Sequence, residues 1–347
     1  MKNILEKDFE YIKKSELKID DFKNSSILIT GATGLIGSLL TRFFLYLNDV
    51  ENYNLNIYAM VRNIDKANSL FSNYSNNNLH YVIADLEKNK INFNREVDYI
   101  VHAAAVTKSK LLISKPVDVI KISVNGTEKV LDLAVKNNVK AMVYLSSMEV
   151  YGQPNLERKI TESDLGKIDL KDPRSCYPEG KRICECLCTA YAHQYNLNVK
   201  IARLAQTFGA GILSTENRVF AQFARSIIGG ENIILHTAGK SEGNYVYTAD
   251  AIKAILMLLL KGKKGQSYNV VNENNHTTIK NMAVEVIKKF GNDNQKVIVD
   301  IPKENMGYAP EVHMHLSNRK MKALGWCPHI GLDEMYSRMI CWMRYKS

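Results

Sequence analysis

A tyrosine and a lysine lie four residues apart in the middle of the chain, as Tyr177 and Lys181. Pro178 favours the start of a helix at this point, and residues four apart on a helix project from the same side. A cationic amine beside a phenol favours the phenolate, so we expect Lys181 to lower the pKa of Tyr177. The pair therefore has the chemistry of a proton acceptor that a neighbouring positive charge activates.

Three glycines at a spacing of three occur near the start of the chain, at Gly31, Gly34 and Gly37. The first would permit a sharp turn, the second a close approach of backbone N–H groups to a phosphate, and the third close packing of a helix. Residues 26–30 have the pattern of a buried strand and residues 38–47 that of an apolar helix. A phosphate would then lie at a helix N-terminus, so the spacing predicts a dinucleotide-binding loop.

Strand and helix patterns alternate along the chain as far as Arg203. The expected strands are 26–30, 56–61, 80–83, 99–103, 141–146 and 199–203. The longest helices expected between them are 117–137 and 178–195. Such alternation indicates an α/β fold of the Rossmann type, in which helices cover both faces of a doubly wound parallel sheet.

The alternation stops after Arg203, where turn residues surround a single expected helix, 218–228. A smaller C-terminal substrate-binding lobe is therefore expected beside the sheet. The predicted division starts with an N-terminal helical extension at 1–24, which contains a helix at 4–14. A dinucleotide-binding domain follows at 25–203, and residues 245–271 return to it through a helix at 249–261 and a strand at 266–271. The substrate-binding lobe consists of 204–244 and 272–347.

The 347-residue chain has the composition of a globular protein, with 46% hydrophobic and 24% charged residues. Its net charge of +10 is scattered, without the basic stripe and interleaved aromatic residues typical of nucleic-acid binding. A pocket for an anionic diphosphate accounts for this charge, so we expect no nucleic acid as partner. The apolar stretch 254–260 is too short for a membrane and residues 1–21 lack a signal-peptide core, which together predict a cytoplasmic protein.

The chain has six cysteines, three of them in the pattern Cys184-x-Cys186-x-Cys188. On a helix, Cys184 and Cys188 share a face while Cys186 points elsewhere. A structural zinc site usually has a second cysteine pair downstream, which this sequence lacks. We therefore expect packed thiols in a reducing compartment and no metal site.

Further motifs follow the glycine loop in order. They are Asp85-Leu86, His102-Ala-Ala-Ala105, Asn125-Gly-Thr127, Ser146-Ser-Met-Glu-Val-Tyr-Gly152 and Tyr177-x-x-x-Lys181. Together they resemble the extended short-chain dehydrogenase/reductase family, of the NAD-dependent epimerase/dehydratase type, over residues 26–250. The family's fold agrees with the one expected from the strand and helix patterns.

The resemblance implies NAD as cofactor, a nucleotide-diphosphate sugar as substrate, and a homodimer formed by helices such as 117–137 and 178–195. The residues it implies in cofactor binding are Gly31, Thr33, Gly34, Leu35, Ile36, Gly37, Arg62, Asp85, Leu86, Ala103, Ala104, Ala105, Tyr177 and Lys181. The positions implied in substrate binding are Ser147, Met148, Glu149, Gln206, Arg218 and Arg225.

In an enzyme of this kind Tyr177 would accept a proton from a sugar hydroxyl as a hydride leaves C4 for the nicotinamide. Ser147 would hydrogen-bond the same hydroxyl and hold it in line. We expect Tyr177, Lys181, Ser147 and Glu149 to be catalytic. The expected reaction passes through a 4-keto intermediate to which the hydride returns, as in an epimerase.

Glu149 bears on the outcome of the reaction. The 4,6-dehydratases that this chain resembles typically have an Asp-Glu pair here, whereas the chain has Met148-Glu149, so dehydration is disfavoured. The Ser147-x-Glu149 pattern, together with Arg174-Ser-Cys-Tyr177, also resembles UDP-glucuronate decarboxylases, which makes decarboxylation the alternative to epimerisation. In a third interpretation Glu149 is a structural carboxylate that accepts backbone N–H groups.

Two positions depart from the family pattern. Gln206 stands where an Asn usually meets the nucleotide, and Gly243 replaces an Arg that commonly holds the sugar diphosphate. Another cation would have to bind the diphosphate. Arg218, Arg225 and Lys240 are the candidates.

The choice of cofactor depends on the residue after the second strand, where an acid favours NAD by bonding the ribose hydroxyls. This chain has Arg62 there and no acid until Asp65. Arg62 could neutralise a 2′-phosphate or stack on the adenine. Because epimerases and decarboxylases of the family mostly retain NAD, we expect NAD, with NADP as the alternative.

Two other functions stay open. A net NADP-linked nucleotide-sugar dehydrogenase or reductase would exchange free cofactor at every turnover. A non-catalytic dinucleotide-binding sensor would keep only the fold. The intact set of Ser147, Tyr177 and Lys181 argues against a sensor.

Overall fold

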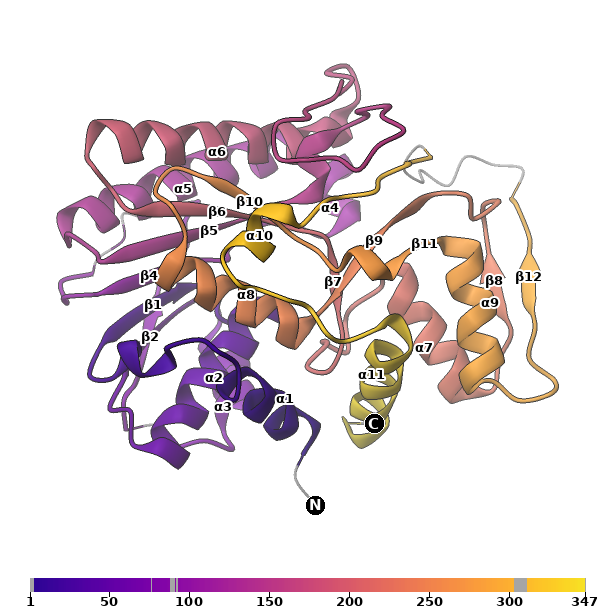
Figure 1. The fold of residues 1–347 in the computed structure, drawn as a ribbon, viewed down its shortest axis with the longest axis horizontal. Helices are drawn as coiled ribbons and strands as arrows, with labels where there is room; N and C mark the ends of the chain where they lie inside the picture. Colours follow the sequence, from indigo (N-terminus) through magenta and orange to yellow (C-terminus); the bar gives the residue numbers. More distant parts are fainter. Residues whose placement is uncertain (1–2, 76, 88–90, 92, 303–310, 347) are drawn as a thin grey trace.

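A parallel sheet of seven strands forms the centre of the molecule (Figure 1). The computed structural model describes residues 3–346 except 76, 88–90, 92 and 303–310. In sheet order the strands are β10 (Ser267–Val270), β6 (Val199–Leu204), β5 (Ala141–Ser147), β4 (Tyr99–His102), β1 (Ser26–Thr30), β2 (Asn56–Val61) and β3 (Leu79–Ile83). Every neighbouring pair is parallel, which confirms the expected Rossmann-type fold.

Helices cover both faces of the sheet, so its strands are largely apolar along their length. Figure 1 shows α2 (Leu35–Glu51), α3 (Ile64–Phe71) and α8 (Thr248–Lys261) on one face, and α5 (Pro116–Lys136) and α6 (Cys176–Gln194) on the other. Chain order reverses between β1 and β4, and sheets of this kind bind ligands at the carboxyl ends of the strands beside such a point. None of the helices in the described ranges combines the length and apolar character needed to cross a membrane.

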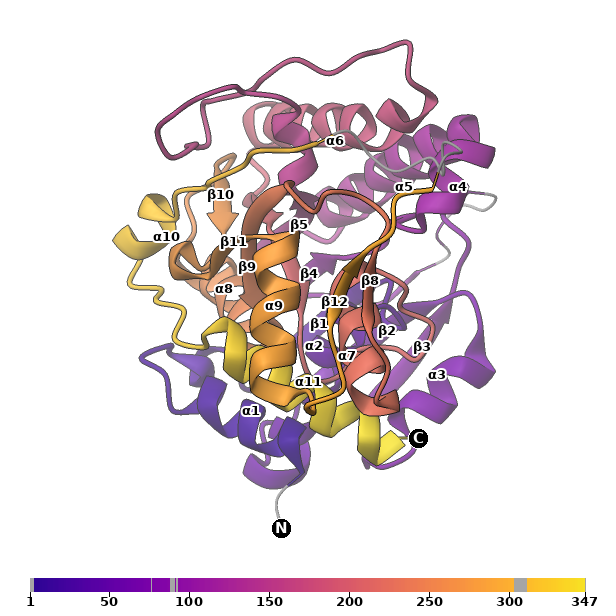
Figure 2. The same cartoon turned by 90° about the vertical axis from the view of Figure 1, so that its right-hand side faces the viewer.

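A smaller lobe lies beside the sheet (Figure 2). It contains a three-stranded sheet of β7 (Gln206–Phe208), β9 (Glu242–Tyr247) and β11 (His276–Thr278), a pair formed by β8 (Ile233–Leu235) and β12 (Val297–Val299), and the helices α7 (Val219–Gly229), α9 (Ile279–Phe290) and α11 (Leu332–Lys346). Because β9 pairs in parallel with β7, the chain returns to the large sheet at α8 rather than at residue 245. β10 then pairs with β6.

The N-terminal segment packs onto α8 and α11 and contributes to the main core. α1 (Ile4–Lys13) buries Phe9, which lies against the rings of Phe43 and Tyr46. The short helix η1 (Ile19–Phe22) places Phe22 against Phe44 and Tyr99. These contacts join the N-terminal extension to α2 and to the first residue of β4, so the extension is part of the main core.

The three closely spaced cysteines lie on α6. Cys184 and Cys188 are fully buried and Cys186 is exposed, as the helical spacing predicts. The thiol of Cys184 lies 3.2 Å from the carbonyl oxygen of Ser123 in α5, so this face of α6 packs closely on its neighbour. All six cysteines of the chain are free thiols.

Candidate active site

The glycine loop has the geometry that a dinucleotide cradle requires. Gly31 has φ +64°, and a Cβ there would lie 2.8 Å from the Cα of Ala104. A Cβ at Gly37 would lie 2.3 Å from the carbonyl oxygen of Gly31. α2 begins after Gly34 without a side-chain cap, so its first N–H groups are directed at the loop. Closely apposed backbone and an uncapped helix N-terminus fit the pyrophosphate of a dinucleotide.

A buried histidine braces the other wall of this cradle. His102 Nδ1 lies 2.6 Å from Thr30 Oγ1, and His102 Nε2 lies 3.2 Å from Thr127 Oγ1. The same Thr30 oxygen accepts the N–H of Ala104 at 3.1 Å. Burial lowers the pKa of His102 to about 3, so the imidazole is neutral and acts as a hydrogen-bonding brace. This network fixes Ala103, Ala104 and Ala105 opposite the glycine loop.

The remaining residues predicted to bind the cofactor lie at the ends of β2 and β3. Arg62 is exposed directly after β2. Burial, Lys108 and Arg62 together lower the pKa of Lys66, so three cations lie near one another at this corner. After β3, the Asp85 side chain accepts the backbone N–H of Glu87 and so stabilises the turn that follows the strand. The group of cations at this corner leaves open the 2′-phosphate alternative drawn from Arg62.

Tyr177 and Lys181 project from the first turns of α6 towards the end of β5, and both side chains are buried. Lys181 Nζ donates to the carbonyl oxygen of Leu145 at 2.7 Å and lies 6.0 Å from the centre of the Tyr177 ring. The pKa of Tyr177 is raised to about 12, chiefly by burial and also by Glu149, against the opposing effects of Ser147, Arg218 and Arg174. The pKa of Tyr177 is therefore raised rather than lowered as expected, because desolvation of the phenol outweighs the neighbouring positive charges.

The end of β5 brings the proposed chemical groups together. Ser147 Oγ accepts the N–H of Glu149 at 3.2 Å, and the Ser147 side chain lowers the pKa of the neighbouring Tyr177 phenol. The carboxylate of Glu149 pairs with Arg174, with 3.0 Å between Oε2 and Nη1 and both side chains about a quarter exposed. Sequence reasoning did not assign Arg174 to the site, although its place three residues before Tyr177 was a signal. The partner of the Glu149 carboxylate is thus a side chain. The third interpretation, in which this carboxylate accepts backbone N–H groups, does not describe the contact seen here.

A buried ion pair stabilises the C-terminal end of β5. Glu185 of α6 accepts the hydroxyl of Ser146 at 2.5 Å and pairs with Arg203 of β6 at 2.7 Å. Arg203 also donates to Tyr151 at 3.0 Å. Because Ser146 directly precedes Ser147, the Glu185–Arg203 ion pair fixes the orientation of Ser147, the last residue of β5.

The second lobe contributes one cation near Tyr177. Arg218 precedes α7, pairs with Glu216 and lies over the Phe220 ring at 4.8 Å, and its charge lowers the pKa of Tyr177. Arg225 instead donates to the backbone oxygen of Glu216 at 2.8 Å, which fixes the loop. Lys240 is exposed before β9. Of the three candidate cations, the structure brings Arg218 to the site.

Gln206 and Gly243 occupy neighbouring strands that lead to the same site. Gln206 begins β7 and is half-buried. A Cβ at Gly243 would lie 4.0 Å from the terminal methyl of Met148 and 4.0 Å from the backbone oxygen of Met314. The position that carries an Arg in the family pattern therefore faces Met148, next to Glu149, and the glycine leaves that space to an apolar side chain.

Comparison with known proteins agrees with this geometry. The model of the NAD dependent epimerase/dehydratase family matches residues 27–272. UDP-glucuronic acid decarboxylase 1 of Xenopus tropicalis is 26% identical over 324 residues, which cover 92% of this chain and 72% of the relative. The dTDP-D-glucose 4,6-dehydratase of Homo sapiens is 26% identical over 336 residues, which cover 92% and 89% of the two chains.

Solved structures show the same fold. UDP-glucose 4-epimerase of Thermotoga maritima, determined with UDP-glucose, superposes with a TM-score of 0.75 at 21% identity, covering 92% of this chain and 99% of that one. UDP-glucuronic acid 4-epimerase of Bacillus cereus, determined with UDP-glucuronic acid and NAD, gives a TM-score of 0.75 at 18% identity, with 93% and 100% covered. The resemblance seen in the sequence motifs is confirmed.

Proposed function

The chain belongs to the NAD-dependent epimerase/dehydratase family of enzymes, and from this premise we propose that it oxidises a nucleotide-linked sugar at C4 and returns the hydride to the resulting 4-keto intermediate. The observation that supports the proposal most directly is the buried Tyr177, which lies beside Ser147 and Lys181 at the strand ends that face the glycine loop. This arrangement suits removal of a proton from an alcohol beside a hydride acceptor.

The cofactor would lie along Gly31–Gly37 and Ala103–Ala105, and when bound NAD supplies a hydride acceptor and later a hydride donor. Tyr177 takes the proton of the C4 hydroxyl, and Ser147 holds that hydroxyl in line. Lys181 stabilises the phenolate form of Tyr177, which is the form that accepts the proton. The burial of Tyr177 and Lys181 keeps bulk water from competing for the proton.

An epimerase-type outcome is the best supported of the reactions that share this first step. Met148 lies where a dehydratase would need an acid, and its half-buried thioether cannot donate a proton. Decarboxylation is the second candidate, because the Arg174 guanidinium beside Glu149 could bind a carboxylate at C6 of the sugar. The decarboxylases among the relatives also favour it.

The experiment that tests the proposal starts from freshly purified protein. Denaturation should release stoichiometric NAD or NADH, identified by absorbance and mass, because an internal redox cycle keeps its cofactor. The protein is then incubated with UDP-glucose and with UDP-glucuronic acid, and products are identified by NMR. An inverted C4 centre supports epimerisation, and loss of C6 as CO₂ supports decarboxylation. Protein that is empty and prefers added NADPH would replace the proposal with a net reductase.

Turnover should fall as pH rises through about 8. Burial lowers the pKa of Lys181 to about 8, so the amine loses its charge above that value and no longer stabilises the Tyr177 phenolate. Initial rates between pH 6.5 and pH 10 measure the effect. In the variant Lys181→Arg the charge persists, so the alkaline decline should move upward. A wild-type rate that still climbs at pH 9.5 would contradict this role of Lys181.

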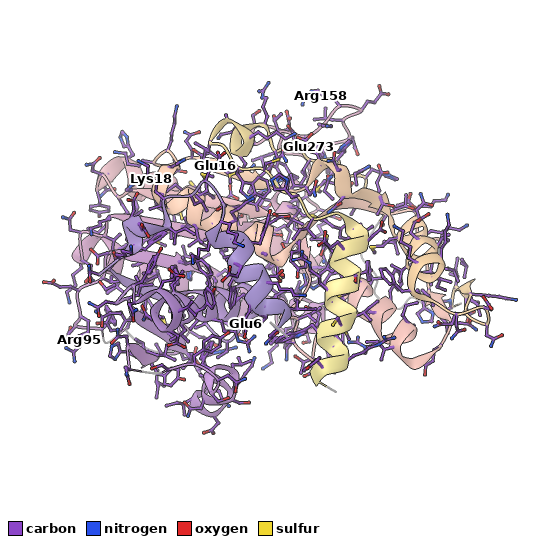
Figure 3. All side chains as sticks on the ribbon, turned by 60° about the horizontal axis from the view of Figure 1, so that its bottom comes forward. Glu6, Glu16, Lys18, Arg95, Arg158 and Glu273 are labelled. Carbon is purple, nitrogen blue, oxygen red and sulfur yellow. The ribbon has the colours of Figure 1, made fainter. Side chains whose placement is uncertain are left out.

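Replacing Arg174 by methionine separates the two candidate reactions. If Arg174 acts through Glu149, kcat should fall by about tenfold with either nucleotide-sugar, because the carboxylate loses its partner. A loss confined to UDP-glucuronic acid would instead show that Arg174 binds the sugar carboxylate. Arg158→Met is the matched control, since Arg158 pairs with Asp164 on the exposed surface (Figure 3).

The proposed assembly is a homodimer formed through α5 and α6. Their outer faces expose Val117, Ile120 and Ile183, which are 60%, 44% and 45% accessible. Light scattering during gel filtration measures the mass, and Ile183→Glu should yield monomer. We also propose a cytoplasmic location, which the six free thiols support.

A further inference from the structure

The N-terminal helix makes a buried polar contact with two elements of the second lobe. Asp8, only 3% exposed, accepts the hydroxyl of Tyr247 at 2.6 Å and forms an ion pair with Arg338. Tyr247 ends β9 and Arg338 lies in the middle of α11. One carboxylate of α1 therefore joins a strand and a helix that come from distant parts of the sequence.

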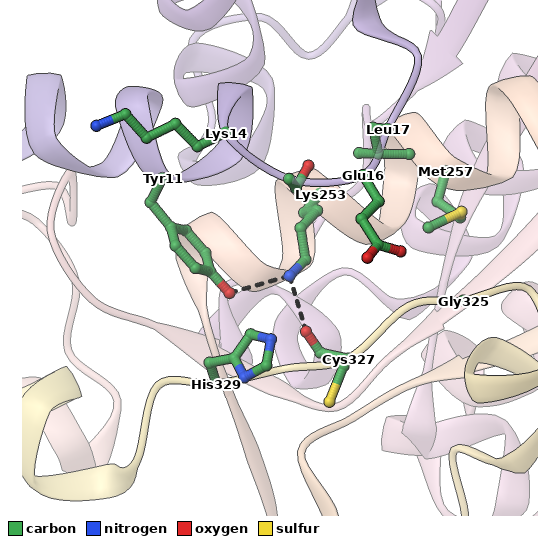
Figure 4. A pocket seen from close by; sticks show the side chains of 10 residues that line it. Tyr11, Lys14, Glu16, Leu17, Lys253, Met257, Gly325, Cys327 and His329 are labelled. Atoms are coloured by element: carbon green, nitrogen blue, oxygen red, sulfur yellow. Dashed lines mark hydrogen bonds between the residues drawn. The ribbon is translucent and has the colours of Figure 1, made fainter.

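A second contact one turn further along α1 reaches α8. The Tyr11 hydroxyl donates to Asp250 Oδ1 at 2.6 Å, and Lys253 Nζ donates to the Tyr11 oxygen at 3.0 Å and to the carbonyl oxygen of Cys327 at 2.8 Å. Figure 4 shows Tyr11, Lys253 and the Cys327 carbonyl converging at the wall of a cavity between the N-terminal segment, α8 and the C-terminal segment. The two contacts hold α1 at both ends of the β9–α8 junction.

The Asp8 contact also borders the segment that carries Arg218. The Tyr247 ring lies against Gly209, where a Cβ would be 2.3 Å from it. Phe208, the neighbour of Gly209, stacks on Phe220 with 4.5 Å between ring centres, and Arg218 lies over the same Phe220 ring. The position of Tyr247 is therefore transmitted by direct packing to the loop 209–218.

α11 holds the same loop by a hydrogen bond. The indole N–H of Trp342 donates to the carbonyl oxygen of Ile212 at 3.1 Å. Trp342 is one turn from Arg338 on α11, so the ion pair with Asp8 fixes the helix that carries this donor. Tyr247 and the helix that carries Arg338 thus both contact residues 209–212.

We propose that Asp8 is a positioning residue for substrate binding: through Tyr247 and Arg338 it holds the loop 209–218, and with it Arg218, against the active site. The inference rests on the role of Arg218 in the proposed function. It gives the N-terminal helix a part in substrate affinity, and none in the chemical step.

The charges around Asp8 make this contact sensitive to acid. The pKa of Asp8 is raised to about 6 because burial, with a smaller contribution from the nearby Asp250 of α8, outweighs the lowering effects of Tyr247 and Arg338. Arg338 also pairs with Glu334 and stays charged throughout, so the carboxyl is the group that titrates. Above pH 6 the ion pair is intact, and below pH 6 protonation of Asp8 removes it. The variant Asp8→Asn therefore mimics the protein at low pH.

Tryptophan fluorescence between pH 5 and pH 8 tests the positioning without any substrate. The chain has two tryptophans, and Trp342 and Trp326 bond the backbone at Ile212 and Asp250, within this contact region. The wild-type emission should shift with a midpoint near 6, and Asp8→Asn should show at pH 7.5 the emission of the acid form. Glu6→Gln, an exposed acid on the same helix, should titrate like the wild type (Figure 3). Superposition of all three curves would overturn the proposal.

Kinetics supply the second measurement. At pH 7.5 the KM of Asp8→Asn for the nucleotide-sugar that the wild type turns over should rise roughly threefold to tenfold, with kcat within about twofold and NAD retention unchanged. An unchanged KM would also overturn the proposal. If Asp8→Asn does not fold, Tyr247→Phe serves instead, because loss of the hydroxyl should move the fluorescence midpoint above 6. Fluorescence that behaves as expected in a protein without nucleotide-sugar activity would reject only the proposed function.

Discussion

Replacing Tyr177 by phenylalanine should lower kcat by roughly 10³-fold while NAD stays bound. The phenolate oxygen of Tyr177 is the group that takes the proton of the C4 hydroxyl, and phenylalanine keeps the ring that packs in the site but lacks that oxygen. Tyr177 is 8% exposed, so water has little access to take over the proton transfer. The measurement is the single-turnover formation of NADH at 340 nm after addition of the nucleotide-sugar.

Tyr195→Phe is the matched control for this variant. Tyr195 caps the other end of the same helix, is half-exposed and lies far from the site along α6. Its replacement should leave the single-turnover rate unchanged. Residual activity of Tyr177→Phe within tenfold of the wild type would mean that another group accepts the proton, and the mechanism would have to be redrawn around Glu149.

Replacing Gly37 by alanine should abolish retention of NAD, with a loss of affinity of at least about 100-fold. The added Cβ would lie 2.3 Å from the carbonyl oxygen of Gly31 and 3.0 Å from the Cα of Ala32, and both contacts are with backbone. Relief of the overlap must move the loop away from α2, which pulls apart the N–H groups that would hold the pyrophosphate. The NAD content of purified protein and the dissociation constant from calorimetry measure the effect.

Gly180→Ala tests whether the loss is specific to the loop. A Cβ at Gly180 would lie 3.5 Å from the Cβ of Ser123, which is an ordinary contact, and Gly180 lies inside α6. Alanine there should leave NAD content unchanged and favour the helix by up to about 1 kcal/mol. Equal NAD content in both variants would show that the glycine loop does not bind the pyrophosphate.

The parts of the fold set by local pattern could be predicted from the sequence. β1 and β2 have the predicted limits, 26–30 and 56–61, because apolar runs between turn residues define buried strands. Tyr177 and Lys181 share a helix face because helical geometry puts residues four apart together. The family resemblance is confirmed for the same reason, since its motifs are short and contiguous.

The features that sequence reasoning missed depend on tertiary contacts. Arg174 and Glu149 are 25 residues apart and meet only because β5 and the start of α6 converge. Tyr177 has a raised pKa because its burial outweighs the neighbouring cations, and burial is a property of the whole fold. β9 pairs with β7 rather than with the large sheet, and three-residue strands such as β7 carry too short a pattern to fix a partner.

The docking of α1 sets an order for folding during synthesis. Asp8 pairs with a residue 330 positions later, and Tyr11 bonds one 239 positions later. At the usual rate of about 5–20 residues per second, roughly 15–65 seconds separate the appearance of Asp8 on the ribosome from that of Arg338. Throughout that interval Asp8 lacks its α11 partner Arg338. The packing of α1 against α11 can therefore form only after α11 has been synthesised.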